Sequence, residues 1–424
     1  MPRRRQAATD PVAIFHDGDR LLAQRGESLA AALIAANRLT LARSPKLHRP
    51  RGPFCLQGGC DGCLARVNGV PSVTTCLQPA RGGERIETQN ALGARSFDFL
   101  AISDLLLPRG LDHHRLLAGS EPLSSLVQKI ARQMAGLGRL PDAVLSARTG
   151  PKISAEVLII GTGAAGSGAA ARLAEHFETH CVDDALEPGG SSRLLDPALS
   201  HARIREAETA GATIHSATTA LGLYRPEPNA PVEALVAGQA GVSRVRPRAV
   251  LIATGAHPTA LAFAGNDLPG VFSARAALQL WRGGILVAER VGVLGSGRFS
   301  KAWCAETRAS VESLQLEASQ LRQLAGRSRV SGAILRNDAE DCRVSFDALL
   351  VDGPGAPAHE LAVQAGARVA FDPRRGYVPQ VDEHGKVAPG VWCAGSCVAA
   401  KDGVADGRRV ASAIRRALEG GAKP

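Results

Sequence analysis

The sequence predicts an α/β protein in which a small domain with a cysteine loop precedes a module of two nucleotide-binding folds. Three observations support this prediction. Four cysteines lie close together near the N-terminus, between residues 55 and 76. Two glycine-rich turns, at residues 161 and 295, each follow an apolar segment and precede a helical one. After residue 153, short strands alternate with helices, which indicates a parallel sheet with crossover connections.

The composition narrows the class of function. The chain has 424 residues, enough for two or three domains. Its net charge is +10, but the excess is spread along the chain, and only 4% of residues are aromatic. Few aromatic side chains leave few platforms on which single-stranded bases can stack, so we expect no nucleic-acid partner. No apolar run reaches the roughly 18 to 20 residues that span a bilayer, so we expect no membrane span.

Residues 1–10 are basic and are expected to form a solvated tail. The apolar core of a secretory signal does not follow them. A twin-arginine signal is the alternative reading, but the hydrophobic segment of such a signal is missing. We therefore expect a cytoplasmic protein, in which cysteines stay reduced. The nine cysteines, an odd count, also disfavour a full disulfide framework.

Residues 11–97 are expected to form the small domain. Asp17-Gly18 separates two apolar runs and predicts a hairpin. Ser28 can cap a helix over residues 29–37.

Residues 98–152 are expected to be a connector that contains an amphipathic helix around residues 126–137. His113 and His114 in this connector are candidate ligands or flavin contacts, although packing at an interface is the favoured interpretation.

The cysteine loop has the spacing C-x4-C-x2-C, followed by twelve residues and a fourth cysteine. This is the plant-type ferredoxin spacing of a [2Fe–2S] cluster, in which a short loop supplies three thiolates and a nearby strand the fourth. The small residues Gly58, Gly59 and Gly62 allow the loop to wrap tightly. Structural zinc usually takes two paired knuckles, so a zinc site and a metal-free remnant are the weaker alternatives. The predicted ligands are Cys55, Cys60, Cys63 and Cys76.

The first glycine-rich turn has the form G-x-G-x-x-G after an apolar strand over residues 156–160. Gly161 permits the tight turn, Gly163 lets the backbone approach a pyrophosphate, and Gly166 allows the helix to pack closely on the strand. The pyrophosphate would lie at the helix N-terminus, against Ala164 and Ala165. The turn therefore predicts a bound dinucleotide.

Other segments complete this predicted site. Asp183 ends the next strand, 22 residues after Gly161, and is placed to bind ribose hydroxyls, with Asp184 as the alternate. Such an acid favours FAD or NAD over NADP. Two further loops are expected near the nucleotide. They contribute Gly189, Gly190, Ser191 and Arg193, and Ala253, Thr254 and Gly255.

Two departures from the usual motifs leave the identity of the bound nucleotides undecided. In the second turn Ser300 replaces the third glycine, so this fold is either a nicotinamide nucleotide site or, as we favour, a degenerate one. Near the C-terminus, Gly395 is followed by Ser396 where flavoproteins of this architecture carry an acid. FAD is therefore expected at the first site, with NAD or another adenine nucleotide as the alternative. Cys393 and Cys397 are a candidate redox pair, although packing is favoured.

The expected fold is a small ferredoxin-like β-grasp domain followed by a two-Rossmann, glutathione-reductase-like module. The first dinucleotide (FAD-type) domain is expected over residues 153–280 and 370–424. The second Rossmann-like (NAD-type) domain is expected as an insertion over residues 281–369. The other cysteines, Cys181, Cys304 and Cys342, are expected to be buried.

With these motifs in this order, the whole chain resembles the alpha subunit of heteromeric sarcosine oxidase. It is equally similar to subunits of hydrogen cyanide synthase and of opine and proline dehydrogenase complexes. The matching stretches include Gly26 to Leu33, the cysteine loop, Pro108 to His114 and Gly265 to Val271. Larger relatives extend further, with extra cysteines or a folate-binding domain, and neither is expected here.

The resemblance implies a division of labour between subunits. A partner flavoprotein would oxidise an amine or amino acid. This chain would relay its electrons through a flavin or nucleotide and a [2Fe–2S] cluster to an external acceptor. FMN at the partner interface is a further cofactor that the resemblance allows. No local set of acid–base residues is recognisable, so the catalytic residues are unassigned. A self-sufficient NAD(P)H-dependent reductase and a structural nucleotide-holding subunit are the alternative functions.

Overall fold

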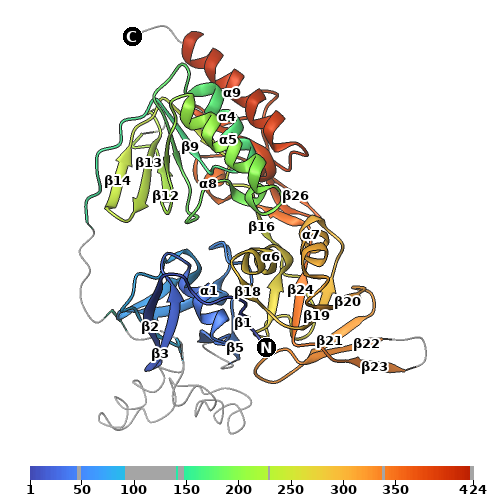
Figure 1. The fold of residues 1–424 in the computed structure, drawn as a ribbon. Helices are drawn as coiled ribbons and strands as arrows, with labels where there is room; N and C mark the ends of the chain where they lie inside the picture. Colours follow the sequence, from blue (N-terminus) through green and yellow to red (C-terminus); the bar gives the residue numbers. More distant parts are fainter. Residues whose placement is uncertain (45–48, 91–139, 142–147, 228–229, 337–339, 421–424) are drawn as a thin grey trace, which may run out of the picture. The chain divides into compact units, whose positions relative to one another are not determined.

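The structure is a computed structural model that describes residues 1–44, 49–90, 140–141, 148–227, 230–336 and 340–420 (Figure 1). The expected connector helix at 126–137, His113 and His114 lie outside these residues. Contacts divide the chain into two units. The first consists of Met1–Leu145 and Ala260–Asp352, and the second of Ser146–Thr259 and Gly353–Pro424. Within the described residues, no helix has both the length and the apolar character needed to cross a membrane.

This division differs from the expected one. The inserted fold was expected over residues 281–369, whereas the first unit already includes the chain from Ala260 and ends at Asp352. The reason is visible in the sheet pairing. The strand Val271–Ser273 (β17) pairs with Ala348–Val351 (β24), so the segment before residue 281 belongs to the inserted sheet.

The N-terminal part of the first unit is a five-stranded sheet with one helix, α1 (Leu29–Ala35). Asp17 and Gly18 both have positive φ and form the predicted hairpin turn, and Ser28 caps α1 by accepting a hydrogen bond from the Ala31 N–H. The strand order is β3-β2-β8-β6-β7, with bounds Asp19–Gln24, Pro11–His16, Arg85–Glu87, Leu64–Val67 and Val70–Thr74. Two short strands, β4 (Ala42–Arg43) and β5 (Pro50–Arg51), pair beside it.

The prediction that residues 1–10 form a solvated tail was wrong. Arg3–Arg4 form a strand, β1, that pairs antiparallel with β18 (Ile285–Leu286) of the inserted fold. The side chain of Arg4 is largely buried and forms an ion pair with Glu27 at 2.5 Å. A largely buried ion pair and strand pairing therefore hold this segment, although its charge alone suggested a solvated tail.

The inserted fold is a four-stranded parallel sheet, in the order β17-β24-β19-β20. It contains β19 (Arg290–Leu294), β20 (Glu312–Leu316), α6 (Ala274–Arg282) and α7 (Arg298–Thr307). An antiparallel sheet follows, formed by β21 (Leu321–Ala325), β22 (Gly332–Arg336) and β23 (Asp341–Val344). Buried apolar side chains such as Phe346 and Leu349 join the two sheets. Of the other cysteines, Cys181 is buried and Cys304 half-buried. Cys342 on β23 is exposed, so that prediction was wrong.

The second unit is built on a six-stranded sheet in the order β11-β10-β9-β15-β29-β28, parallel except for β28. Its strands are Thr213–His215, Thr179–Val182, Val157–Ile160, Ala249–Ile252, Val391–Cys393 and Lys386–Ala388. The helices are α4 (Ala164–Leu173), α5 (Pro197–Thr209), α8 (Glu360–Gln364) and α9 (Gly403–Gly420). Two-stranded sheets join β16 (Ala256–Pro258) to β25 (Gly355–Pro357) and β26 (Val369–Asp372) to β27 (Gly376–Pro379).

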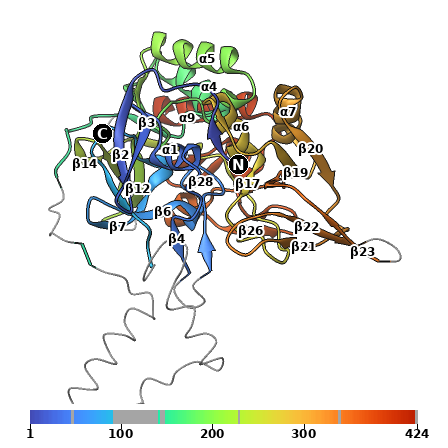
Figure 2. The ribbon, with the colours of Figure 1, turned by 60° about the horizontal axis from the view of Figure 1, so that its bottom comes forward.

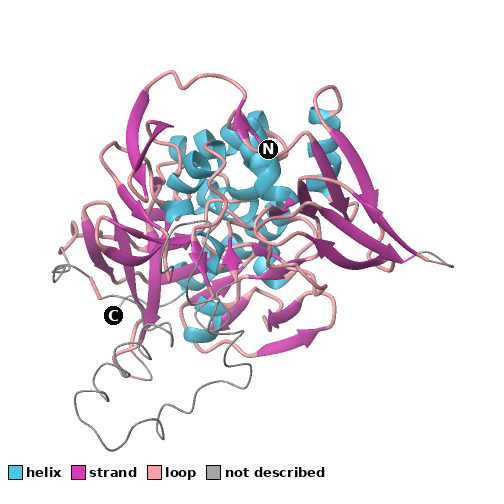
Figure 3. Ribbon diagram, turned by 90° about the horizontal axis from the view of Figure 1, so that it is seen from below, coloured by secondary structure: helices cyan, strands magenta, loops and turns pink. Residues whose placement is uncertain are grey.

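The central strand β9 shows why this unit has three layers. All four of its side chains are buried, and alternate ones point to opposite faces. Val157 and Ile159 pack with α4 and α9. Leu158 and Ile160 pack against the antiparallel sheet of β12 (Thr219–Tyr224), β13 (Glu233–Gly238) and β14 (Gly241–Val245). Figures 1 and 2 show α4, α5 and α9 grouped together, and Figure 3 shows the mixture of helices and strands.

Two stacked histidines on β10 and β11 predict an acid-sensitive stability. Nδ1 of His180 lies 2.9 Å from Nε2 of His215. Partial burial lowers the pKa of both imidazoles, and the neighbouring ring lowers that of His215 further. The unfolded chain therefore binds protons first as the pH falls below about 6.5. Discounted for partial exposure, this costs at most about 1 kcal/mol of unfolding free energy. A plot of melting temperature against pH from 7.5 to 5 should fall less steeply for His215→Gln, and equal slopes would contradict the prediction.

Candidate functional site

The four loop cysteines lie as two pairs. Cys55, Cys63 and Cys76 are buried, and Cys60 is half-buried. The thiols of Cys55 and Cys60 are hydrogen-bonded to each other, and so are those of Cys63 and Cys76. Among the described residues, no group of three or more His, Cys, Asp or Glu side chains converges as it would around one metal ion. The thiols instead offer two ligands at each of two neighbouring positions, which fits the two irons of a [2Fe–2S] cluster.

One thiol of each pair is favoured as the thiolate, the form that binds metal. A hydrogen bond from the Cys55 thiol, helped by backbone N–H groups, lowers the pKa of Cys60 to about 6 although burial opposes it. The Cys76 thiol lowers the pKa of Cys63 in the same way. The donors, Cys55 and Cys76, have raised pKa values because of these hydrogen bonds and because they are buried.

Backbone N–H groups of the loop are directed at the cysteine sulfurs. The Gly58 N–H donates to Sγ of Cys76 at 3.2 Å, and the Gln57 N–H lies 3.4 Å from Sγ of Cys55. Gly58 has φ +72°, and a β-carbon there would lie 2.8 Å from the Leu77 side chain. A β-carbon at Gly62 would lie 2.1 Å from the carbonyl oxygen of Gly52. The positive φ therefore favours glycine at position 58, and backbone packing requires it at position 62.

The glycines of the first dinucleotide turn have distinct surroundings. A β-carbon at Gly161 would lie 2.5 Å from the carbonyl oxygen of Ala253, and one at Gly166 would lie 1.8 Å from that of Gly161. Both are needed for packing. A β-carbon at Gly163, by contrast, would meet no atom of the described residues within 4 Å. Gly163 is the N-cap of α4, so open space lies where a helix N-terminus can receive a phosphate.

The two adjacent acids after β10 differ in exposure. Asp183 is only 7% exposed, and one of its oxygens accepts hydrogen bonds from both the N–H and the hydroxyl of Thr162. Its other oxygen accepts from the Ala185 N–H at 3.0 Å. Asp184 is exposed. The carboxylate of Asp183 thus faces the turn itself, and Asp184 is the acid on the surface of this edge.

Thr162 is a site residue that the sequence analysis missed. Besides its bonds to Asp183, its hydroxyl oxygen accepts a hydrogen bond from the Gly189 N–H at 3.0 Å. It therefore joins the glycine turn to the second predicted loop, in which a β-carbon at Gly190 would lie 2.9 Å from Cα of Gly163. That loop continues into a 3₁₀ turn over Gly190–Leu194, where Arg193 pairs with Glu187 at 2.7 Å. The only signal was a small polar residue between the two glycines.

The remaining predicted residues follow β15 and β29. Gly255 has positive φ with no described atom near its β-carbon position, while the Thr254 hydroxyl donates to the carbonyl of Ala358. A β-carbon at Gly395 would lie 2.7 Å from Cβ of Ala165, which places this turn beside α4. Ser396 is exposed.

Asp406 on α9 is a second residue that sequence reasoning missed. Its carboxylate accepts a hydrogen bond from the Gly395 N–H at 2.8 Å and pairs with Arg409 at 2.7 Å. Cys393 and Cys397 are both buried, and the Cys397 sulfur lies 3.2 Å from the carbonyl oxygen of Ala394. An acid is therefore present at this turn, but its carboxylate is hydrogen-bonded to the backbone N–H of Gly395.

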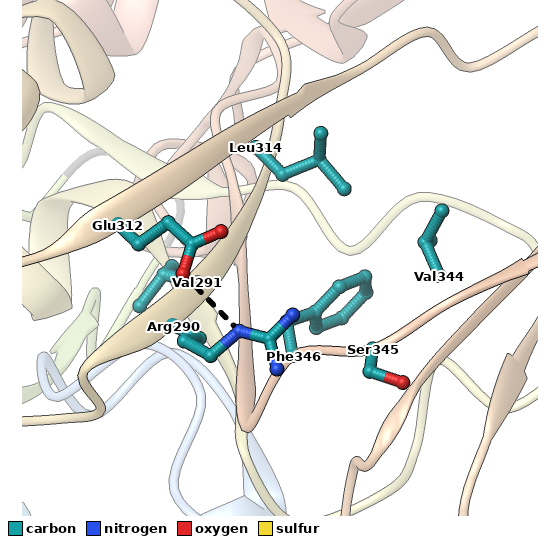
Figure 4. Close-up of a pocket in the computed structure, with 7 residues that line it drawn as sticks. All are labelled: Arg290, Val291, Glu312, Leu314, Val344, Ser345 and Phe346. Carbon is teal, nitrogen blue, oxygen red and sulfur yellow. Dashed lines mark ion pairs between the residues drawn. The ribbon is translucent and has the colours of Figure 1, made fainter.

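The inserted fold also contains a pocket of about 240 Å³, shown in Figure 4. An ion pair between Arg290 and Glu312, at 3.3 Å, lies at its side, and Phe346 and Leu314 line it. Arg290 and Glu312 are the first residues of β19 and β20. The pocket is therefore at the amino ends of these parallel strands, whereas the glycine-rich turn at residue 295 is at their carboxyl end.

Known proteins resemble this chain in its N-terminal domain, its sequence and its fold. Residues 9–91 match the 2Fe-2S iron–sulfur cluster binding domain. Over 307 residues the chain is 29% identical to sarcosine oxidase subunit alpha of Rhizobium meliloti (strain 1021), covering 63% of this chain and 30% of that protein. Over 303 residues it is 27% identical to the same subunit of Corynebacterium sp. (strain P-1), covering 65% and 27%. In sequence, the chain therefore resembles sarcosine oxidase subunit alpha. The alignments span less than a third of either relative.

A crystal structure of L-proline dehydrogenase from P. horikoshii shares the fold of this chain. The match has a TM-score of 0.73 and 22% identity, and it covers 98% of this chain and 76% of that one. It confirms the predicted α/β architecture, in which a ferredoxin-like domain is joined to a dinucleotide-binding module.

Proposed function

We propose that this chain is an iron–sulfur and flavin electron-transfer subunit of a heteromeric dehydrogenase or oxidase that acts on amines or amino acids. The observation that carries the proposal is the two-and-two pairing of Cys55, Cys60, Cys63 and Cys76 within the domain that matches the cluster-binding family. The sarcosine- and proline-oxidising names of the relatives support substrates of the CH–NH class.

The chain's own residues suit a one-electron relay. Cys55 and Cys60 would hold one iron and Cys63 and Cys76 the other. When bound, the cluster supplies one-electron transfer, and a flavin supplies exchange between one and two electrons. The Gly58 N–H, already directed at Sγ of Cys76, would stabilise negative charge on the sulfur. Burial of Cys55, Cys63 and Cys76 would keep water from three of the four sulfurs.

At the first dinucleotide site, Gly163 and the N-terminus of α4 would receive the pyrophosphate, between the turns of Gly190 and Gly395. Asp184 would bind ribose hydroxyls. FAD is the proposed nucleotide, and NAD or another adenine nucleotide is the alternative because Ser396 offers a hydroxyl in place of a carboxylate. FMN is proposed only at an interface with the partner.

We propose an amine-oxidising flavoprotein as the partner, with substrate oxidation on that subunit, an external electron acceptor and a cytoplasmic location. The chain would then need no catalytic acid–base set of its own.

The test is to purify the intact complex without oxygen and to measure its iron, acid-labile sulfide and nucleotide, followed by reduction with candidate secondary amines. We expect iron and sulfide in equal amounts and bleaching of flavin and cluster by an amine. A complex without iron would overturn the cluster. Reduction of the isolated chain's flavin by NADH would favour a reductase, and an adenine nucleotide without redox-active flavin would favour a structural role.

A further inference from the structure

The second glycine-rich turn already holds an anion that belongs to the chain itself. A β-carbon built at Gly297 would lie 2.6 and 2.8 Å from the two carboxylate oxygens of Asp352. One of these oxygens also accepts a hydrogen bond from the Ser300 N–H at 2.7 Å, in the first turn of α7. The carboxylate therefore occupies the space in front of the helix N-terminus.

The two Rossmann folds of the chain provide an internal comparison. The β-carbon position of Gly161 lies 2.5 Å from the carbonyl oxygen of Ala253, and that of Gly295 lies 2.5 Å from that of Asp352. Ala253 and Asp352 are thus equivalent residues at the end of equivalent strands. Alanine leaves the space at Gly163 open, whereas aspartate fills it at Gly297. A pyrophosphate there would have to displace a carboxylate, whose charge has the same sign.

The same fold makes close contacts with the ferredoxin-like domain, and both belong to the first unit. The Ser273 N–H, at the end of β17, donates to the carbonyl oxygen of Phe54 at 2.9 Å, directly before Cys55. Arg51 pairs with Asp267 at 3.0 Å. The loop that contains the cysteines is therefore fixed to the edge of the inserted sheet.

The N-terminal strand adds a second attachment. β1 pairs with β18 of the inserted fold, and its Arg4 forms two hydrogen bonds with Glu27 of the ferredoxin-like domain, with both side chains less than 20% exposed. The Arg5 guanidinium lies 3.5 Å from the centre of the Trp281 ring, a favourable cation–π geometry. Residues 3–5 therefore clasp the two domains together.

We infer that the inserted Rossmann fold does not bind a nucleotide and instead holds the ferredoxin-like domain in place. The carboxylate of Asp352 occupies the position that a phosphate would take. Removing that carboxylate opens an anion site at α7, and breaking the clasp loosens the ferredoxin-like domain. The inference depends on neither the cluster nor the identity of the nucleotide at the first site.

The first experiment uses the full chain with Gly163→Asp, which places a carboxylate in front of α4 and closes the first site. In this background NADH and inorganic pyrophosphate should not raise the melting temperature. With Asp352→Ala added, the melting temperature should fall and pyrophosphate should restore part of it, with binding about three- to tenfold tighter than before. Asp352→Asn serves as a second variant, because its amide oxygen can still accept from the Ser300 N–H. The inference would be overturned if NADH raised the melting temperature while Asp352 is intact. It would also be overturned if pyrophosphate did not raise the melting temperature of the Asp352 variants.

The second experiment measures hydrogen exchange of the full chain with Arg4→Glu, using Arg3→Glu as the matched control. Arg3 pairs with Glu289 but is mostly exposed, so its replacement should change little. Arg4→Glu places two carboxylates together at a largely buried position. Exchange should quicken about tenfold or more in peptides that contain β18 and Ser273, because the strand pairing opens. Equal exchange in the two variants would overturn the clasp.

Discussion

Replacement of Cys63 by serine is expected to abolish the iron–sulfur absorption of the purified protein and to remove its iron and labile sulfide. Cys63 is one of the four proposed ligands, and a hydrogen bond from Cys76 already favours its thiolate. Loss even of groups that orient ligands costs about 10–100-fold in metal affinity, and loss of a ligand should cost more. Because cluster binding adds to folding free energy, the ferredoxin-like domain should also melt at a lower temperature.

The exposed Cys342 provides the control, since it lies on β23 away from the loop. Cys342→Ser should keep iron, sulfide and visible absorption at the level of the unaltered chain. Full iron content in Cys63→Ser would show that the loop does not bind its metal as proposed. A single bound zinc in place of iron, measured after anaerobic purification, would point to the alternative metal.

The parts that were predictable from sequence are those that local chemistry determines. Four consecutive buried side chains over Val157–Ile160, followed by glycines and an alanine-rich helix, leave little choice but a central parallel strand and its crossover. The hairpin at Asp17-Gly18 follows equally directly, because few other residue pairs tolerate two positive φ angles.

The parts that were missed depend on contacts between distant residues. β1 and β18 each have two residues and are about 280 positions apart, so neither shows a periodicity that a sequence pattern could reveal. Asp352 was not singled out because nothing in its neighbourhood shows that it faces the turn at Gly297. Asp406 reaches the Gly395 N–H from a helix that begins eight residues later. Each is a side chain whose role is set by packing rather than by spacing.

Which of Asp183 and Asp184 faces the ribose also depends on packing that the sequence does not reveal. We predict that replacing Asp183 lowers stability, whereas replacing Asp184 weakens nucleotide binding. Asp183→Ala should lower the unfolding free energy of the second unit by about 3 kcal/mol, because it leaves the N–H groups of Thr162 and Ala185 without their charged acceptor. The melting temperature should fall by about 6–12 °C. Asp184→Ala, at an exposed position, should change the stability by less than about 0.5 kcal/mol.

Although Asp184→Ala should barely change stability, it should weaken nucleotide binding. Loss of hydrogen bonds from a carboxylate to ribose hydroxyls should weaken the binding of FAD, or of the adenine nucleotide in its place, by about tenfold. Titration of the nucleotide-free chain with FAD and with ADP measures this for both variants. Asp184→Asn keeps one acceptor oxygen, so its nucleotide affinity should lie between those of the unaltered chain and Asp184→Ala. If Asp184→Ala bound both nucleotides as tightly as the unaltered chain while Asp183→Ala remained folded and lost binding, the carboxylate at the ribose would be Asp183, and its bonds to Thr162 would have to open when the nucleotide enters.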